Sequence, residues 1–251
     1  MRILLSIIIG LQIQIFANGQ TLPKEVQKCH FGDSDCIVDK MNQVIKNYPK
    51  GIPEIGLKPI DIVDIKNLTF GNGDRNLSSW ITLHFFNHVN YGFENTTITK
   101  VSGFNKDPTK NKLEISGRIP NLVHKGTYFA NGRLYLVELN CTGEMTTEFQ
   151  NFTFNLKFKV IPEYRNNKLY IRVYELVPLV AISRWVLWME DFFIENSDLT
   201  IAVNHVINKN WLEFWNELEP TLLEGFASAF NNIVEDIFNK VSYTDLFLPD
   251  D

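Results

Sequence analysis

The sequence lacks the short motifs that mark most enzymes and metal sites. Its 251 residues contain no Gly-x-Ser-x-Gly nucleophile elbow, no His-Glu-x-x-His pair and no glycine-rich phosphate loop. His84 and His88 are four residues apart, but on a strand they would lie about 13 Å apart, too far to share one ion. We therefore expect no catalytic residue, no metal site and no cofactor, and hence no enzyme.

The sequence also lacks strong charge and any internal linker. The net charge is only −5, so the chain has no excess of positive charge with which to bind nucleic acid or an anionic membrane. No run rich in glycine, serine or proline and no block of like charge divides residues 20–251. We expect these residues to form one domain.

Long apolar runs are missing except at the start of the chain. A positively charged start leads into the apolar stretch 3–16, and Ala17 and Gly19 then occupy the −3 and −1 positions of a cut before Gln20. The run is too short to span a bilayer, which takes about 20 apolar residues. We predict a signal peptide over residues 1–19 and a secreted protein without stable membrane insertion.

Cysteine is scarce, with three residues in the chain. Cys29 and Cys36 are close enough for a local disulfide, which would stabilise the fold by roughly 2–3 kcal/mol, whereas a metal pair would lack further ligands nearby. Cys141 shares the alternation phase of Leu139, so we expect a buried free thiol, with an intermolecular disulfide as the alternative. Five Asn-x-Ser/Thr sequons predict N-glycosylation: Asn67, Asn76, Asn95, Asn140 and Asn151.

Hydrophobic periodicity predicts a short helix near the N-terminus. Apolar residues recur at three- and four-residue spacing from Ile37 to Tyr48. Asp33 precedes this stripe as a start signal and Pro49 ends it. We expect an amphipathic helix that the Cys29–Cys36 disulfide ties to the N-terminal segment.

From about residue 60 to 180 the period changes to two, which predicts antiparallel strands with one apolar and one wet face. Odd-numbered residues from Leu77 to Phe85 are apolar apart from Ser79, and we expect this phase to continue to Phe93, with His88 on the wet face. Two further runs alternate in the same way, Leu113 to Ile119 and Phe152 to Val160. Asn166-Asn167 is typical of a tight hairpin turn.

The C-terminal region supplies a long apolar helix to cover these strands. Bulky apolar residues at helical spacing begin at Trp211, with Asn208 or Asn210 as candidate N-caps. A helix from Trp211 to Lys240 would be about 45 Å long, and Pro220 should kink it or split it in two. We predict an α+β fold in which a highly curved antiparallel sheet wraps around the long C-terminal helix.

Four segments occur in an order and at a spacing that are more specific than any one of them. They are Cys29-x6-Cys36 with Gly32-Asp33; Gly51-Ile52-Pro53-Glu54-Ile55-Gly56-Leu57; Gly126-Thr127-Tyr128 followed by Gly132; and Asn208-Lys209-Asn210-Trp211. On these segments the chain resembles the insect takeout and juvenile-hormone-binding protein family, from about Leu22 to Pro249. The resemblance implies the tubular lipid-binding fold and an interior tunnel for an apolar ligand.

Two departures from the family pattern bear on function. Hemolymph juvenile hormone carriers of this family typically have a second disulfide, whereas this chain has only Cys141 left over. The chain therefore looks more like the takeout branch, whose ligands are less defined. A glycine that the family often places before the last segment is Glu195 here, which puts the local turn in doubt.

Together these features predict a carrier, secreted into hemolymph or another extracellular fluid, that holds a small apolar ligand such as a terpenoid or a fatty acid. Tyr128 is a candidate polar donor that would orient the ligand. Further candidate ligand contacts, chosen from inward phases, are Leu83, Phe85, Val137, Phe154, Phe158, Phe226 and Phe230. The same residue types would also pack a helix against a sheet, and the Tyr128 hydroxyl would equally well bind to backbone. The alternative is an extracellular signalling or interaction protein, with a protein partner and a packed core. A cavity above about 300 Å³ would favour the carrier.

Overall fold

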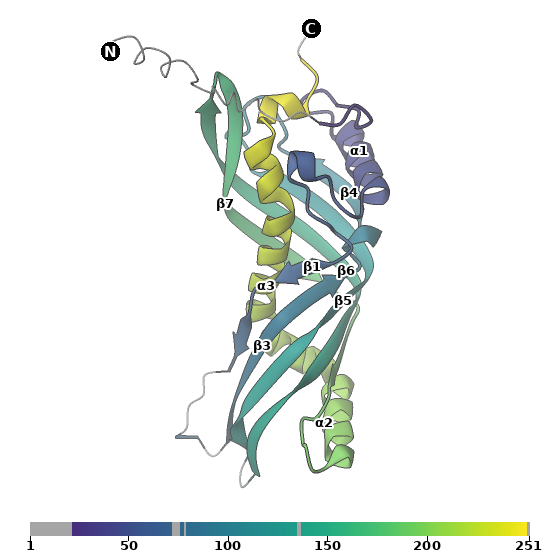
Figure 1. Cartoon of the computed structure of the whole chain (residues 1–251), viewed down its shortest axis with the longest axis vertical. Helices are drawn as coiled ribbons and strands as arrows, with labels where there is room; N and C mark the ends of the chain where they lie inside the picture. Colours follow the sequence, from purple (N-terminus) through teal and green to yellow (C-terminus); the bar gives the residue numbers. More distant parts are fainter. Residues whose placement is uncertain (1–21, 72–75, 78, 135–136, 250–251) are drawn as a thin grey trace, which may run out of the picture.

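The computed structural model describes residues 22–71, 76–77, 79–134 and 137–249. The expected signal peptide lies outside these residues. Eight antiparallel strands form one sheet that curves around a long helix, α3 (Trp211–Lys240) (Figure 1). The predicted fold, a curved antiparallel sheet around a C-terminal helix, is therefore confirmed.

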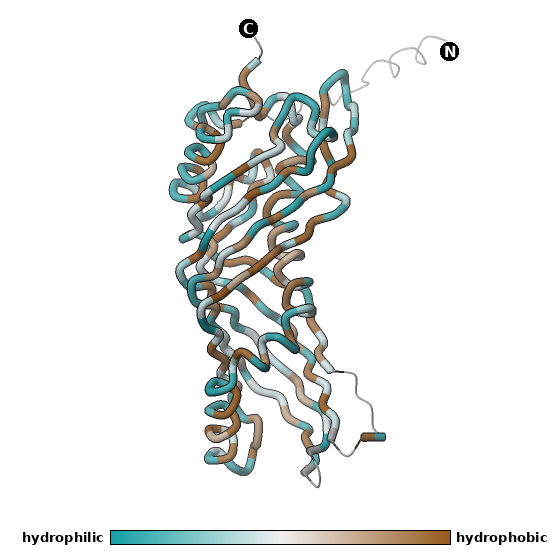
Figure 2. The backbone as a smooth tube through the Cα atoms, turned by 180° about the vertical axis from the view of Figure 1, so that it is seen from behind, coloured by the Kyte–Doolittle hydropathy of each residue, from teal (hydrophilic) through white to brown (hydrophobic). Residues whose placement is uncertain are grey.

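Two very long strands form the centre of the sheet. The strands are β1 (Val63–Ile65), β2 (Leu68–Phe70), β3 (Ser79–Tyr91), β4 (Thr97–Ser102), β5 (Leu113–Leu134), β6 (Val137–Arg165), β7 (Lys168–Ala181) and β8 (Arg184–Met189). Their main order is β1-β3-β5-β6-β7, with β2 on β3, β4 on β5 and β8 on β6. Figure 2 shows hydrophilic and hydrophobic residues alternating along these strands. Asn166 and Asn167 join β6 to β7 with φ of 50° and 62°, which confirms the predicted hairpin turn.

A β-bulge at Asn87 reverses which side chains of β3 face the interior. Asn87 has a φ of 54°, and the pairing of β3 with β5 shifts there. Phe85 is buried before the bulge, whereas His88 and Asn90 are buried after it. The prediction that the odd-numbered phase continues, with His88 on the wet face, is therefore wrong, because the bulge inserts one residue into the alternation.

Helix α3 is one element from Trp211 to Lys240 with Pro220 inside it, so of the two predicted outcomes, a kink or a split, the split does not occur. The proline is exposed, and the opposite face of the helix carries large aromatic side chains into the sheet. Phe226 packs against Phe152 at a ring-centroid distance of 4.9 Å, and Phe230 packs against Phe154 at the same distance. This packing stabilises the half of the helix that follows Pro220, although the proline itself removes one backbone hydrogen bond.

Helix α1 (Ser34–Asn47) begins where the sequence predicts it. The side chain of Asp33 accepts a hydrogen bond from the Cys36 amide at 3.1 Å and caps the helix. A disulfide joins Cys29 to Cys36, as predicted, and ties this helix start to the N-terminal segment. Cys141 is buried and free, in agreement with the favoured expectation.

Helix α2 (Ser197–Lys209), which the sequence analysis did not predict, lies at the end of the molecule opposite α1 (Figure 1). Two asparagines attach it to β8. Asn204 bonds the amide and carbonyl of Met189 at 2.9 and 2.8 Å, and Asn208 bonds those of Leu187 at 2.9 and 2.6 Å. Asn208 is therefore not a cap of α3, and Asn210, at the cap position, makes no capping bond with its side chain.

Candidate ligand-binding cavity

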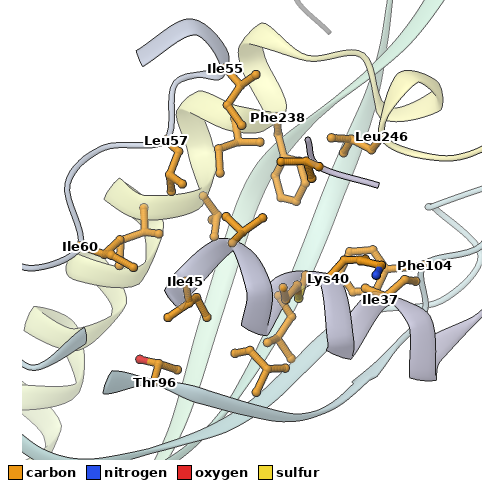
Figure 3. A pocket seen from close by; sticks show the side chains of 18 of the residues that line it. Ile37, Lys40, Ile45, Ile55, Leu57, Ile60, Thr96, Phe104, Phe238 and Leu246 are labelled. Carbon is orange, nitrogen blue, oxygen red and sulfur yellow. The ribbon is translucent and has the colours of Figure 1, made fainter. Parts of the chain in front are cut away.

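A partly open cavity of about 280 Å³ lies at the end of the molecule where α1 packs against the sheet. Its walls are α1, the segment 55–60, the inner faces of β4 to β6, and the C-terminal half of α3 with the short helix η3 (Tyr243–Leu246). Figure 3 shows side chains from these elements pointing toward one another across the space. The cavity therefore lies between segments from both ends of the chain.

Helix α1 supplies one complete wall. Ile37, Met41, Val44 and Ile45 lie on one face of this helix and line the cavity. Asn42 fixes the helix on the edge strand β4, because its side chain donates to the Ile98 carbonyl at 3.0 Å and accepts from the Ile98 amide at 2.8 Å. The sequence predicted this apolar stripe, but its role as a cavity wall was missed.

The segment 55–60 can approach α3 because Gly56 has no side chain. Gly56 has a φ of 82°, and a Cβ atom there would lie 2.7 Å from the carbonyl oxygen of Asp236. This close approach brings Ile55 and Leu57 into the cavity wall beside Phe238 (Figure 3). Gly56, the second glycine of the Gly51 to Leu57 segment, thus has a direct packing role.

The two ends of the described chain meet at the cavity and cover one side of it. Cys29 forms a parallel β-bridge with Phe247, and the Leu248 amide donates to the Cys29 carbonyl at 2.9 Å. The ring of Phe31 stacks on that of Phe247 at 4.4 Å between centroids. Cys29 and Phe247 both line the cavity, so this crossing forms its cap.

The lining offers few polar groups. Nearly all lining side chains are hydrocarbons or, in Met41, a thioether. The exceptions are Cys29, which is in the disulfide, and the polar residues Gln27, Lys40 and Thr96. The Lys40 ammonium is paired with Asp39 at 2.9 Å, which leaves its aliphatic stem for the wall. Such a lining suits an apolar molecule and offers little to a charged one.

Of the eight candidate ligand contacts, Phe154 and Phe230 line this cavity. The side chain of Val137 lies outside the described residues. Five others do not belong to the lining: Leu83, Phe85, Tyr128, Phe158 and Phe226. These five side chains point inward but lie in the packed core instead. Phe226 packs between Phe149 and Phe152, and Phe85 packs against Phe70.

Tyr128 is fully buried, and its hydroxyl donates to the carbonyl of Glu190. Burial raises the pKa of this phenol well above its usual range. Gly143 lies opposite on β6, where a Cβ atom would come within 2.1 Å of the same carbonyl oxygen. The structure thus shows the alternative left open by the sequence, a core tyrosine bound to backbone.

All five sequon asparagines are exposed, as glycan attachment requires.

Within the described ranges, no group of three or more His, Cys, Asp or Glu side chains could hold a metal ion. Nor does any helix in that part of the chain have the length and apolar character needed to cross a membrane.

Comparison with known proteins agrees with this fold. The chain is 21% identical over 232 residues to the circadian clock-controlled protein daywake of Drosophila yakuba, covering 91% of this chain and 89% of that protein; daywake of Drosophila melanogaster matches equally. The crystal structure of Epiphyas postvittana Takeout 1 has the same fold, with a TM-score of 0.72 at 19% identity, covering 88% of this chain and 98% of that one. The sequence profile described as haemolymph juvenile hormone binding protein matches residues 4–248. The chain therefore belongs to the haemolymph juvenile hormone binding protein family.

Proposed function

We propose that the protein binds one small apolar molecule in the cavity beneath α1 and carries it through extracellular fluid. The cavity itself carries this proposal: it is recessed beneath α1, almost entirely apolar, and about 280 Å³ in volume. That volume falls just short of the size of about 300 Å³ above which a cavity would favour the carrier, so the apolar lining supports the proposal more than the size does. The family description names a haemolymph protein that binds a hormone, which agrees with the signal peptide expected at residues 1–19.

The energetics of such a site favour modest affinity for an apolar ligand. Burial of about 300 Å² of ligand surface would contribute roughly 7–8 kcal/mol at 25 cal/mol per Å². The loss of translational and rotational freedom then removes several kcal/mol. We expect micromolar affinity or better, because the walls are already formed.

Binding without catalysis is the proposed activity. The polar groups of the lining, Gln27, Lys40 and Thr96, do not include a nucleophile held by a base. An interaction protein with a fully packed core, the alternative raised by the sequence, would have no reason to keep an apolar space of this size open. A protein partner is not needed for the proposed role.

The test is ligand capture by the secreted protein. Protein purified from insect-cell medium would be studied by native mass spectrometry, with organic extraction of any bound molecule, and titrated with the fluorescent probe N-phenyl-1-naphthylamine. We expect one probe per protein and displacement by fatty acids or terpenoids. No bound molecule and no displaceable probe would end the carrier proposal.

A matched pair of variants places the probe in the cavity. Val44→Trp adds bulk from the α1 wall and should weaken probe binding strongly. Gln43→Trp adds the same side chain on the exposed side of the same helix and should leave binding unchanged. Equal effects of the two variants would place the probe elsewhere.

A further inference from the structure

Asn90 and His124 face each other across β3 and β5 inside the molecule. Their exposed fractions are 0% and 1%. Three of their side-chain atoms, Asn90 Oδ1, Asn90 Nδ2 and His124 Nδ1, have no hydrogen-bond partner among the described residues. Buried polar atoms almost always have a hydrogen-bond partner, because burial removes their bonds to water and only a new bond compensates for that loss. The pair therefore lacks a polar group that would bond to these three atoms.

The neighbouring His88 determines which proton each imidazole carries. Its Nε2 lies 2.9 Å from the carbonyl oxygen of Thr127, which can only accept, so Nε2 is protonated and Nδ1 is bare. His124 Nε2 lies 2.6 Å from that Nδ1 and therefore donates to it. Burial, and secondarily the adjacent His88, lower the pKa of His124 to about 3. His124 is thus neutral, and its free Nδ1 is a hydrogen-bond acceptor.

The three free atoms define the chemistry of the missing partner. Asn90 Nδ2 is a donor, whereas Asn90 Oδ1 and His124 Nδ1 are acceptors, and none of the three bonds to another. A group placed beside them must accept from Nδ2 and donate to at least one of the two acceptors. A hydroxyl does both, whereas an ether, ester or epoxide oxygen only accepts.

The pair is close to the proposed ligand cavity. Phe93 follows Asn90 by three residues and lines that cavity, so their Cα atoms are at most about 11 Å apart. The ring of Phe93 lies edge-on against that of Phe230, also a lining residue, at 5.4 Å between centroids. Neither Asn90 nor His124 lines the cavity, so an apolar chain would reach the polar pair only if the Phe93 ring turned aside.

We propose that Asn90 and His124 form a polar subsite for the hydroxyl group of the bound molecule, which accepts from Asn90 Nδ2 and donates to His124 Nδ1. The apolar tail of that molecule extends past Phe93 into the cavity. The inference rests on the proposed carrier function and narrows its ligand to long-chain or terpenoid alcohols and protonated acids. Ethers and esters of the same chain cannot donate a hydrogen bond to His124 Nδ1.

The test compares 1-dodecanol with 1-methoxydodecane, which share a chain and differ in the hydroxyl. Both would displace N-phenyl-1-naphthylamine from the full secreted protein. We expect the alcohol to bind about tenfold more tightly, the factor given by roughly one net hydrogen bond. Asn90→Leu keeps the side-chain size and should abolish this preference without changing the affinity for the ether.

Thr147→Val is the matched control. Thr147 lies beside His124 on the neighbouring strand β6 and is equally buried. Its hydroxyl already donates to the Val186 carbonyl at 2.9 Å, so the preference for the alcohol should persist in this variant. If Asn90→Leu fails to fold, the nitrogen NMR chemical shift of His124 Nδ1 in the wild-type protein gives the answer. It should move on addition of 1-dodecanol and not on addition of 1-methoxydodecane.

Three outcomes would overturn the subsite. The first is displacement of the probe by both compounds with equal affinity, which leaves the carrier function intact. The second is an unchanged Nδ1 shift with bound alcohol. The third is a crystal structure with 1-dodecanol in which a water molecule occupies the gap and the alcohol oxygen lies elsewhere. Failure of both compounds to displace the probe, or of the probe to bind, would instead count against the carrier function.

Discussion

The backbone of Gly126 lies directly against the imidazole ring of His88, so that a Cβ atom at position 126 would come within 1.9 Å of His88 Cδ2. The Asn87 bulge turns His88 inward, and the absent side chain of Gly126 provides the space for its ring. This relationship explains the glycine of the Gly126-Thr127-Tyr128 segment by packing alone.

Gly126→Ala should therefore destabilise the protein by about 2–3 kcal/mol, because the ring must move and lose its bond to the Thr127 carbonyl. Urea unfolding followed by tryptophan fluorescence measures the change. Adding His88→Ala should recover much of the loss, since the clash is with that ring. An alanine that costs the same in both backgrounds would show that some other contact requires the glycine.

Phe154→Trp and Phe158→Trp should behave differently, although the two residues share one face of β6. Phe154 lines the cavity, so the larger ring should occupy ligand space and weaken probe binding with little loss of stability. Phe158 is 1% exposed and lies in the core, so the same change should destabilise by about 1–3 kcal/mol through overpacking. Melting temperature and probe titration on both variants separate the effects. Equal behaviour would mean that Phe154 is not a cavity wall.

Stability should fall as the pH drops below about 6.5. Burial lowers the pKa of both His88 and His124 in the folded protein, the latter to about 3. Between the unfolded value and these lower values the unfolded chain binds protons that the folded protein does not, so acid favours unfolding by up to about 1.4 kcal/mol per pH unit for each histidine.

Urea titrations at several values between pH 7 and pH 5 measure this slope. In that window most carboxylates of the unfolded chain are already ionised, so histidines dominate the change. The double variant His88→Leu and His124→Leu should show a much flatter profile than the wild-type protein. An unchanged slope would assign the effect to other groups.

Asn204→Leu should loosen α2 from β8 at Met189, while Asn208 keeps its bonds to Leu187 and the apolar contacts of the helix stay in place. The change removes both bonds to Met189 and leaves the amide and carbonyl of an edge strand without their partner. We expect a loss of about 2–3 kcal/mol and faster amide hydrogen exchange at Met189. Asn210→Leu is a suitable control, because that side chain bonds only within its own helix end. Similar exchange in both variants would contradict the docking role.

Regular elements could be predicted from the sequence because their patterns survive in the structure. The alternation from Phe152 to Val160 and the stripe beginning at Trp211 each follow one period, and tertiary packing uses that period directly. The Asn87 bulge could not be predicted, since an asparagine in a strand adopts either extended or left-handed backbone depending on its neighbours in the sheet. One such residue was enough to exchange the faces of all residues that follow it in β3.

Two other features were hidden for different physical reasons. Helix α2 is attached by the amide groups of Asn204 and Asn208 rather than by a broad apolar stripe, so periodicity carries little signal for it. The cavity was located only in part, through Phe154 and Phe230. Core and cavity walls use the same side chains, and the difference between them is a space that no single residue encodes.

The bridge between Cys29 and Phe247 has a consequence for how the molecule forms during synthesis. While the ribosome is still adding residues, α1 and the long strands can already form, but the C-terminal part of the cap over the cavity has not been made. The cap is thus completed after the other walls, when residues 243–248 are added and pair with the segment around Cys29. Until then the apolar interior at this end faces water, and a hydrophobic molecule present at that moment can enter before the bridge between Cys29 and Phe247 forms.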